Sequence, residues 1–203
     1  MGRRTAAGLL VAVLTLFAVP ALEAQNSPQF ELTAFAGGAL FISDLAGDNY
    51  LLPGTNERYD APKMDNGIAL GGHLGFRFGK VSLEGTLAFI PSSFTGINSS
   101  SAQESIDTNV LIYGASLLYT LPSQNQLMDI FLVGGVGAKT HSPDTGDGET
   151  NFGGNVGLGL RVWVTPTMAL RFEGRDYISP YTDGNLQNDL IISAGLSIAP
   201  GQG

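Results

Sequence analysis

Charged side chains in this chain recur at every second position, opposite a row of apolar ones. The clearest example has Arg171, Glu173 and Arg175 alternating with Leu170 and Phe172. A β-strand places residues i and i+2 on the same face, so an extended segment here would hold one carboxylate between two guanidiniums. The chemistry that this spacing predicts is ion pairing on one face of a strand.

Other alternating segments also carry ionisable side chains on their polar faces. The candidates for a common ion-pair network are Glu31, His73, Arg77, Glu84, Arg161, Arg171, Glu173 and Arg175, and Asp129 and Lys139 share the same faces. Buried charges need partners. Cross-strand spacing predicts that Glu173 is the one carboxylate among three guanidiniums, that of Arg161 included. It also predicts that Glu84 lies diagonal to Arg77 and His73.

Catalysis and metal binding find weaker support in the sequence. The chain has no cysteine, which excludes disulfides, thiolate metal sites and cysteine nucleophiles. His141 and Ser142 are adjacent and would point to opposite faces of a strand, so they make a poor base and nucleophile. Asp144, Asp147 and Glu149 could form a weak Ca²⁺ site, but they lack the full ligand spacing of a calcium loop, and a solvated acidic loop is the alternative. We expect no enzymatic activity and no cofactor.

Eight segments with a two-residue alternation position these side chains. They span residues 30–41, 67–78, 81–90, 108–120, 127–139, 152–164, 168–178 and 190–198. The connections between them alternate in length: the long ones are 43–66, 91–107, 141–151 and 179–189, and the short ones are 79–80, 121–126 and 165–167. Such wiring predicts an all-β fold, an eight-stranded antiparallel up-and-down barrel with all the long loops on one rim.

The pairing of the hairpin at residues 152–178 indicates which face of the barrel is inside. A three-residue turn would place Val164 opposite Met168, Gly159 opposite Glu173 and Gly157 opposite Arg175. Long polar side chains opposite glycines suit a narrow, crowded, polar interior. The apolar face would then look outward at lipid, as in a transmembrane barrel. The rival is a soluble barrel with the apolar face inward.

The N-terminus has the layout of a secretory signal peptide. Arg3 and Arg4 precede an apolar run from Ala6 to Ala18, and a small-residue site ends at Ala24. The run is shorter than the ~20 residues that a membrane-spanning helix needs. We therefore predict a signal peptide at residues 1–24, export by the general secretory route and a barrel domain at residues 25–203. The net charge of −8 argues against nucleic-acid binding.

Two stretches carry a resemblance to a known family. VGLGLRVWVTPTMALRFEGRDY and the closing LIISAGLSI resemble the last three strands of the small eight-stranded outer-membrane barrels, the OmpA-type transmembrane domain and its relatives. The resemblance covers the whole mature chain, and its motifs are degenerate. It implies a Gram-negative outer membrane, contact with its lipid, and periplasmic chaperones and barrel-assembly machinery as partners during biogenesis. One departure is that Ile198, rather than an aromatic residue, closes the last strand.

The distribution of charge bears on function. The four long connections hold 12 of the 17 acidic residues that follow the predicted signal peptide and only 2 of the 8 basic ones, so the rim that they form should carry a negative field. We expect a non-enzymatic integral outer-membrane protein with a polar, plugged lumen, acidic extracellular loops and a structural or surface-interaction role. The alternative is a narrow, cation-preferring, porin-like channel for small solutes. The sequence names no loop ligand.

Overall fold

A computed structural model describes residues 29–42, 50–51, 58–98, 103–125, 127–144, 147–180 and 186–200. The predicted signal peptide at residues 1–24 lies outside these ranges. The described residues form ten strands: β1 (Gln29–Phe41), β2 (Tyr50–Leu51), β3 (Arg58–Met64), β4 (Gly67–Phe78), β5 (Val81–Asn98), β6 (Gln103–Thr120), β7 (Met128–Pro143), β8 (Glu149–Thr165), β9 (Met168–Pro180) and β10 (Leu186–Ile198). Among these residues, no helix has the length and apolar character needed to cross a membrane.

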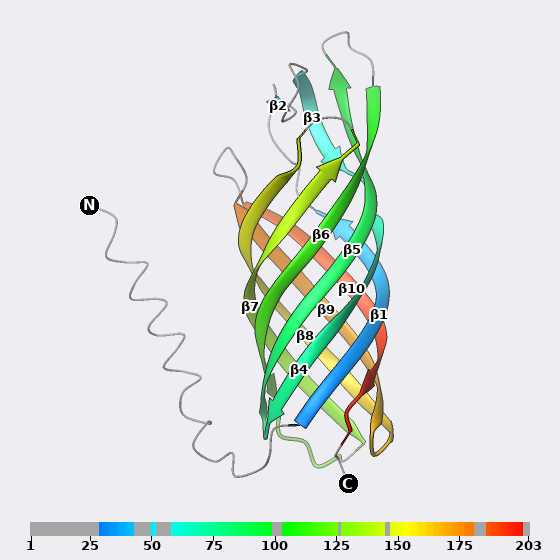
Figure 1. The fold of residues 1–203 in the computed structure, drawn as a ribbon, viewed down its shortest axis with the longest axis vertical. Helices are drawn as coiled ribbons and strands as arrows, with labels where there is room; N and C mark the ends of the chain where they lie inside the picture. The colour runs from blue at the N-terminus through cyan, green and yellow to red at the C-terminus, as the bar shows by residue number, and fades with distance from the viewer. Residues whose placement is uncertain are drawn as a thin grey trace, which may run out of the picture.

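Eight of the strands close into a barrel, which confirms the predicted fold (Figure 1). Each pairs antiparallel with its neighbours in the order β1-β4-β5-β6-β7-β8-β9-β10, and β1 pairs with β10 to complete the circle. β1 begins and β10 ends at the lower rim in Figure 1, where the short turns also lie. We call this the short-turn rim and the opposite end the long-loop rim.

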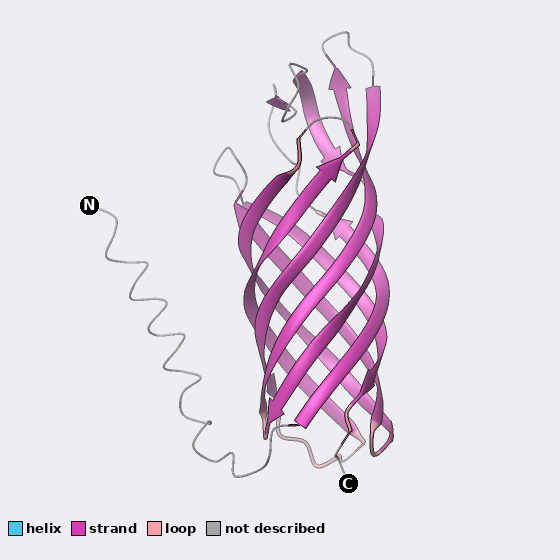
Figure 2. Ribbon diagram, viewed as in Figure 1, coloured by secondary structure: helices cyan, strands magenta, loops and turns pink. Residues whose placement is uncertain are grey.

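The strands extend further toward the long-loop rim than the alternating segments predicted. Residues 91–107 are mostly strand rather than loop, because β5 continues to Asn98 and β6 starts at Gln103. Within the predicted connection 43–66, β3 pairs with this extension through Met64 and Phe94. The extended β5–β6 hairpin projects beyond the barrel beside β3 (Figures 1 and 2). The serine-rich composition that favoured a loop is overridden by pairing and by buried Phe94 and Ile106.

Two other predicted connections are shorter than expected. β7 reaches Pro143 and β8 begins at Glu149. β9 reaches Pro180 and β10 begins at Leu186, so most of the predicted loop at residues 179–189 is strand. The inward alternation of β10 therefore begins earlier in the chain than we predicted.

The β8–β9 hairpin has the predicted register except next to its turn. Gly159 lies opposite Glu173 and Gly157 opposite Arg175, as expected. Val164 does not lie opposite Met168, because an irregularity between Trp163 and Thr165 lets Thr165 take that place and leaves a two-residue turn. A bulge of this kind absorbs one residue without changing the faces of the rest of the strand.

The outer face of the barrel is apolar. The exposed large hydrophobic side chains on its strands include Leu32, Leu70, Phe76, Leu87, Leu132, Leu158, Phe172 and Ile192. The ionisable candidates from the same strands are buried or half-buried on the opposite, inner face. An apolar outside around a polar inside is the arrangement of a transmembrane barrel, in which the outer side chains face lipid.

Candidate functional site

The inner face brings seven of the eight predicted candidates together in one central ion-pair network. Six of them are carboxylates and arginines, and the seventh, His73, lies beside them. We use that name for Glu31, His73, Glu84, Arg161, Arg171, Glu173 and Arg175, which are each at most 6% exposed. The residues come from β1, β4, β5, β8 and β9, so only closure of the barrel can bring them together. Arg77 lies apart from this group.

Two carboxylates and two guanidiniums form the middle of the network. Arg171 Nη1 lies 2.7 Å from Glu84 Oε2, and Arg175 Nη2 lies 2.9 Å from Glu84 Oε1. Arg175 Nε donates to Glu173 Oε1 at 2.5 Å, and Arg171 Nε donates to Glu173 Oε2 at 3.0 Å. Each carboxylate therefore contacts both arginines, and the four charges balance. Glu173 is not the one carboxylate of the cluster, because Glu84 reaches the same pair across the lumen.

Arg161 has a different partner from the one predicted. Its Nε donates to Glu31 Oε1 at 2.9 Å rather than to Glu173. The guanidinium carbons of Arg161 and Arg171 lie 4.4 Å and 4.8 Å from the centre of the Phe131 ring. Cation–π contact with a buried ring adds to the ion pairs here.

The glycines of β8 make room in a way that the sequence did not indicate. A Cβ atom at Gly159 would collide with the Phe131 ring, and one at Gly157 would collide with the backbone of β9 and with Val133. The space opposite Glu173 is therefore taken by Phe131 of β7. Phe131 itself is fully buried.

Arg77 belongs to a second polar group, the Asp129 group, near the short-turn rim. Its Nη2 donates to Asp129 Oδ2 at 2.9 Å and to Thr120 Oγ1 at 3.2 Å. Trp163 Nε1 donates to the same Asp129 oxygen at 2.9 Å. Arg77 has the predicted position diagonal to Glu84, because Gly75 lies opposite Glu84 in the β4–β5 register, but its side chain reaches across the lumen and pairs with Asp129. The alternation of β8 carried the signal for Trp163, since it shares a face with Arg161.

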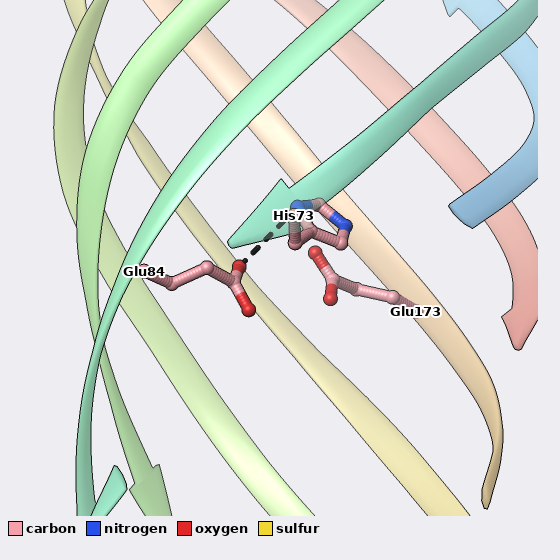
Figure 3. Close-up of side chains that lie close together, drawn as sticks. All are labelled: His73, Glu84 and Glu173. Carbon is pink, nitrogen blue, oxygen red and sulfur yellow. Dashed lines mark ion pairs between the residues drawn. The ribbon is translucent and has the colours of Figure 1, made fainter. Parts of the chain in front are cut away.

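His73 lies between carboxylates of two other strands (Figure 3). Its Nδ1 is 3.0 Å from Thr86 Oγ1 and 3.4 Å from Glu84 Oε1, and its ring stacks on Phe35 at a centroid distance of 4.6 Å. Within the described residues, His73, Glu84 and Glu173 are the only set of three whose ligand atoms all lie within 4.8 Å of one another. Because both carboxylates already bind Arg171 and Arg175, a metal ion would compete with two guanidiniums. The donor set fits ion pairing better than metal binding.

The loop carboxylates form no comparable group. Asp144, Asp147 and Glu149 are absent from the sets of close ligand atoms found in the described part of the chain. His141 is buried and Ser142 is exposed, on opposite faces of β7.

A third polar group, the Lys139 group, was not predicted from the sequence. Lys139 Nζ donates to Gln187 Oε1 at 2.7 Å and forms a buried ion pair with Asp189. The sequence predicts that Lys139 faces the lumen but indicates no partner for it, because Gln187 and Asp189 fall within the predicted connection 179–189. Extending the alternation of β10 backward from Ile191 would have found both.

The lumen is not polar throughout. An apolar cluster of buried side chains lies beyond the central network toward the long-loop rim, mainly on β1, β4, β5 and β6: Ala39, Met64, Ala69, Ala88, Ile90, Phe94, Ile106, Val110, Ile112 and Ile191. The prediction of a wholly polar lumen is therefore wrong in this region. The alternation of these strands already places small or apolar residues such as Ala69, Ala88 and Ile191 on the inner face.

A closed antiparallel barrel with an apolar outside and a charged inside defines the class of outer-membrane barrel proteins. Residues 9–197 match the model of the outer membrane protein beta-barrel domain, and the chain belongs to that family. The protein is thus an OmpA-like transmembrane barrel of a Gram-negative outer membrane.

Solved structures of the same fold have low sequence identity to this chain. OprG from Pseudomonas aeruginosa is 12% identical with a TM-score of 0.64, covering 84% of this chain and 95% of its own. Neisserial surface protein A is 19% identical with a TM-score of 0.58, covering 83% and 96%. The N-terminal barrel domain of P. aeruginosa OprF is 11% identical with a TM-score of 0.51, covering 86% and 99%. No curated protein matches the chain.

Proposed function

We propose that this protein is a non-enzymatic scaffold of the outer membrane whose plugged barrel holds its extracellular strands and loops at the cell surface. The observation that supports the proposal is that buried inward side chains pack together at successive levels of the barrel. The Asp129 group, the central ion-pair network and the apolar cluster follow one another from the short-turn rim upward. An eight-stranded barrel has an interior just wide enough for side chains to fill.

The parts of the molecule beyond the barrel support a surface role. The β5–β6 hairpin and β3 project past the rim that faces outside in proteins of this class (Figure 1). In the sequence of the four long connections together, acidic residues outnumber basic ones by 12 to 2. One of these twelve acids is not at the surface, because Asp189 lies in the lumen with Lys139. An acidic surface favours basic or cationic partners.

The absence of enzymatic activity is part of the same proposal. His73 is buried with its ring against Phe35, and its hydroxyl neighbour Thr86 is buried with it. His141 and Ser142 point to opposite faces. A hydroxyl nucleophile needs a base within hydrogen-bond reach and access to substrate, and neither histidine combines the two.

The class of protein also indicates how the chain is exported and inserted into the outer membrane. We infer that residues 1–24 direct the chain through the general secretory route, and that periplasmic chaperones and the barrel-assembly machinery insert residues 25–203. The charged and apolar pattern of the first residues supports the former, and membership of the barrel family supports the latter.

A narrow, cation-preferring channel is the second candidate, favoured by the acid-rich outer region. Planar-bilayer recording of the folded mature protein separates the two. The scaffold proposal expects no steady conductance from the native barrel. A matched variant, Glu84→Ala with Arg171→Ala, keeps the charge balanced while removing bulk from the central network, and should conduct. Steady cation-selective conductance from the native protein would favour the channel.

A further inference from the structure

Asp176 lies deep on the lipid-facing side of the barrel wall, on the face of β9 that carries exposed hydrophobic side chains. The ladder of paired residues that starts at Phe30 runs through all eight barrel strands, passes Asp176 and returns to β1 at Leu40. It climbs from residue 30 to residue 40 of β1 in eight strands, so Asp176, six strands along, is level with Gly38. The outward residues of β1 are apolar or glycine from Phe30 to Ile42. Asp176 is therefore near the middle of the apolar band.

A carboxyl group at this depth needs a partner in the membrane. Ionisable residues among lipid chains are costly and mark functional sites, and Asp176 Oδ1 has no hydrogen-bond partner among the described residues. Of the eight basic residues that follow the predicted signal peptide, five point into the lumen, Lys80 lies in a turn, and Arg58 and Lys63 lie on β3. The lipid-facing side of the described barrel strands thus offers no cation.

A groove lined by small residues adjoins Asp176. It has a volume of about 760 Å³, and Gly174, Ala194 and Ala36 line it from the adjacent strands β9, β10 and β1. A Cβ atom at Gly174 would meet nothing within 4 Å. On the other side of β9, Leu158 of β8 lies opposite Gly174 and is 62% exposed. Small residues let two protein surfaces approach closely within lipid, and polar groups hold them together there.

We propose that this face of β8, β9, β10 and β1 binds a second copy of the chain in the same membrane, with the Asp176 carboxyl groups of the two copies in contact. Copies inserted in one orientation are related by a twofold axis along the membrane normal, so a residue at the axis meets itself at the same depth. The two groups share a proton, which one carboxyl donates and the other accepts, because two carboxylates in contact cannot both stay charged.

The twofold axis also accounts for the groove. An axis that passes through β9 sets β8 of one barrel against β10 of the other, so Leu158 of each copy fills the groove of its partner. A lipid chain could fill the groove as well, but it brings no hydrogen-bonding group to the depth of Asp176. The contact is reversible, because lipid replaces it with equally apolar surface. Copies diluted in lipid separate, and Asp176 is then a cost to the lone barrel.

Disulfide cross-linking of single-cysteine barrels tests the contact, because the chain has no cysteine of its own. Ile178→Cys places a thiol on β9 two positions above Asp176, close to the proposed axis. Leu111→Cys is the control, on the lipid-facing side of β6 and three strands away. Both proteins, folded in lipid vesicles at the same density and checked by heat-modifiable gel mobility, are oxidised with copper phenanthroline and run on a non-reducing gel.

The proposal predicts that Ile178→Cys forms covalent dimers about fivefold faster than Leu111→Cys, and that adding Asp176→Leu removes the excess. Adding Asp176→Asn should keep it, because an amide both donates and accepts a hydrogen bond. Equal cross-linking of the two thiols would overturn the proposal. An excess that survives Asp176→Leu, or that is lost in Asp176→Asn, would overturn it too, because a shared proton between the carboxyl groups would not be holding the copies together.

A second measurement needs no cysteine in the contact. Lys80→Cys, in the exposed turn between β4 and β5, carries a donor or an acceptor dye, and energy transfer between mixed copies is followed as the barrels are diluted in lipid. Transfer should persist to about fivefold greater dilution with Asp176 present than with Asp176→Leu. Identical dilution curves would contradict the dimer.

Discussion

The buried arginines of the lumen differ in how many carboxylates each one contacts. Glu84 and Glu173 each contact both Arg171 and Arg175, so neither arginine depends on a single partner. Arg161 differs, because its one close carboxylate is that of Glu31 and its Nη1 atom has no partner among the described residues. Loss of a partner should therefore be most costly at Arg161.

Replacement of Glu31 by Gln tests this dependence. Breaking a buried ion pair while leaving the other charge in place typically costs ~3–5 kcal/mol, so Glu31→Gln should lower the free energy of unfolding by about that much. Adding Arg161→Met removes the stranded charge and should restore most of the loss. Urea unfolding in lipid vesicles, followed by the fluorescence of the single tryptophan, Trp163, measures both. A double variant no more stable than Glu31→Gln would refute the pairing.

The sequence predicted which side of the barrel wall each charged side chain occupies, but it did not predict which side chains form ion pairs. Alternation identified the inward position of Glu84, Arg161 and Glu173 because a strand fixes sides by parity alone. It could not identify the pairing of Arg161 with Glu31 or of Arg77 with Asp129. Those contacts cross the lumen, and they depend on the tilt and stagger of all eight strands rather than on the register of one hairpin.

At the scale of strands, facing residues of β7 and β8 are complementary in side-chain size. Phe131 lies opposite Gly159 in their register, and its ring fills the place of a side chain there. Gly159→Ala should therefore push the ring against Arg161 and Arg171 and destabilise the barrel by ~1–3 kcal/mol, the usual cost of overpacking.

Relief of that collision provides the control. Phe131→Leu in the Gly159→Ala background makes space for the new methyl group, so it should restore part of the lost stability in the same urea experiment. An Ala at position 159 that costs nothing in the native background would mean that the ring does not occupy this space.

The strand boundaries mark another limit of sequence reasoning. The segment from Pro91 to Asp107 is rich in serine and asparagine, which favours loops, yet β5 and β6 pair through it with Phe94 opposite Ile106. The cause is tertiary, since β3 covers this extension through Met64. Local composition cannot report a partner strand that lies in another connection.

At the scale of the whole molecule, the outer face of the described barrel strands is largely apolar, and Asp176 is an acidic residue on that face. Asp176 occupies an outward position on β9 between Val156 and Leu190, and its Oδ1 atom has no hydrogen-bond partner among the described residues. Charged groups on the lipid face destabilise a barrel, by less for acids than the ~2–4 kcal/mol typical of Arg or Lys at mid-depth. Asp176→Leu should therefore raise the stability of the barrel in lipid vesicles. A drop in stability would show that the carboxylate has a partner in the membrane.

The central claim about the whole barrel is that its charges are inside, paired across the lumen, while its apolar face meets lipid. Urea unfolding of Glu173→Gln in lipid vesicles tests it most directly, with Asp147→Asn on the exposed β7–β8 connection as the control. Loss of one of the two carboxylates that balance Arg171 and Arg175 should destabilise the barrel by ~3–5 kcal/mol, less whatever water in the lumen screens, while the control changes little. Equal effects of the two substitutions would contradict the account, because Glu173 would then lie outside any charge cluster.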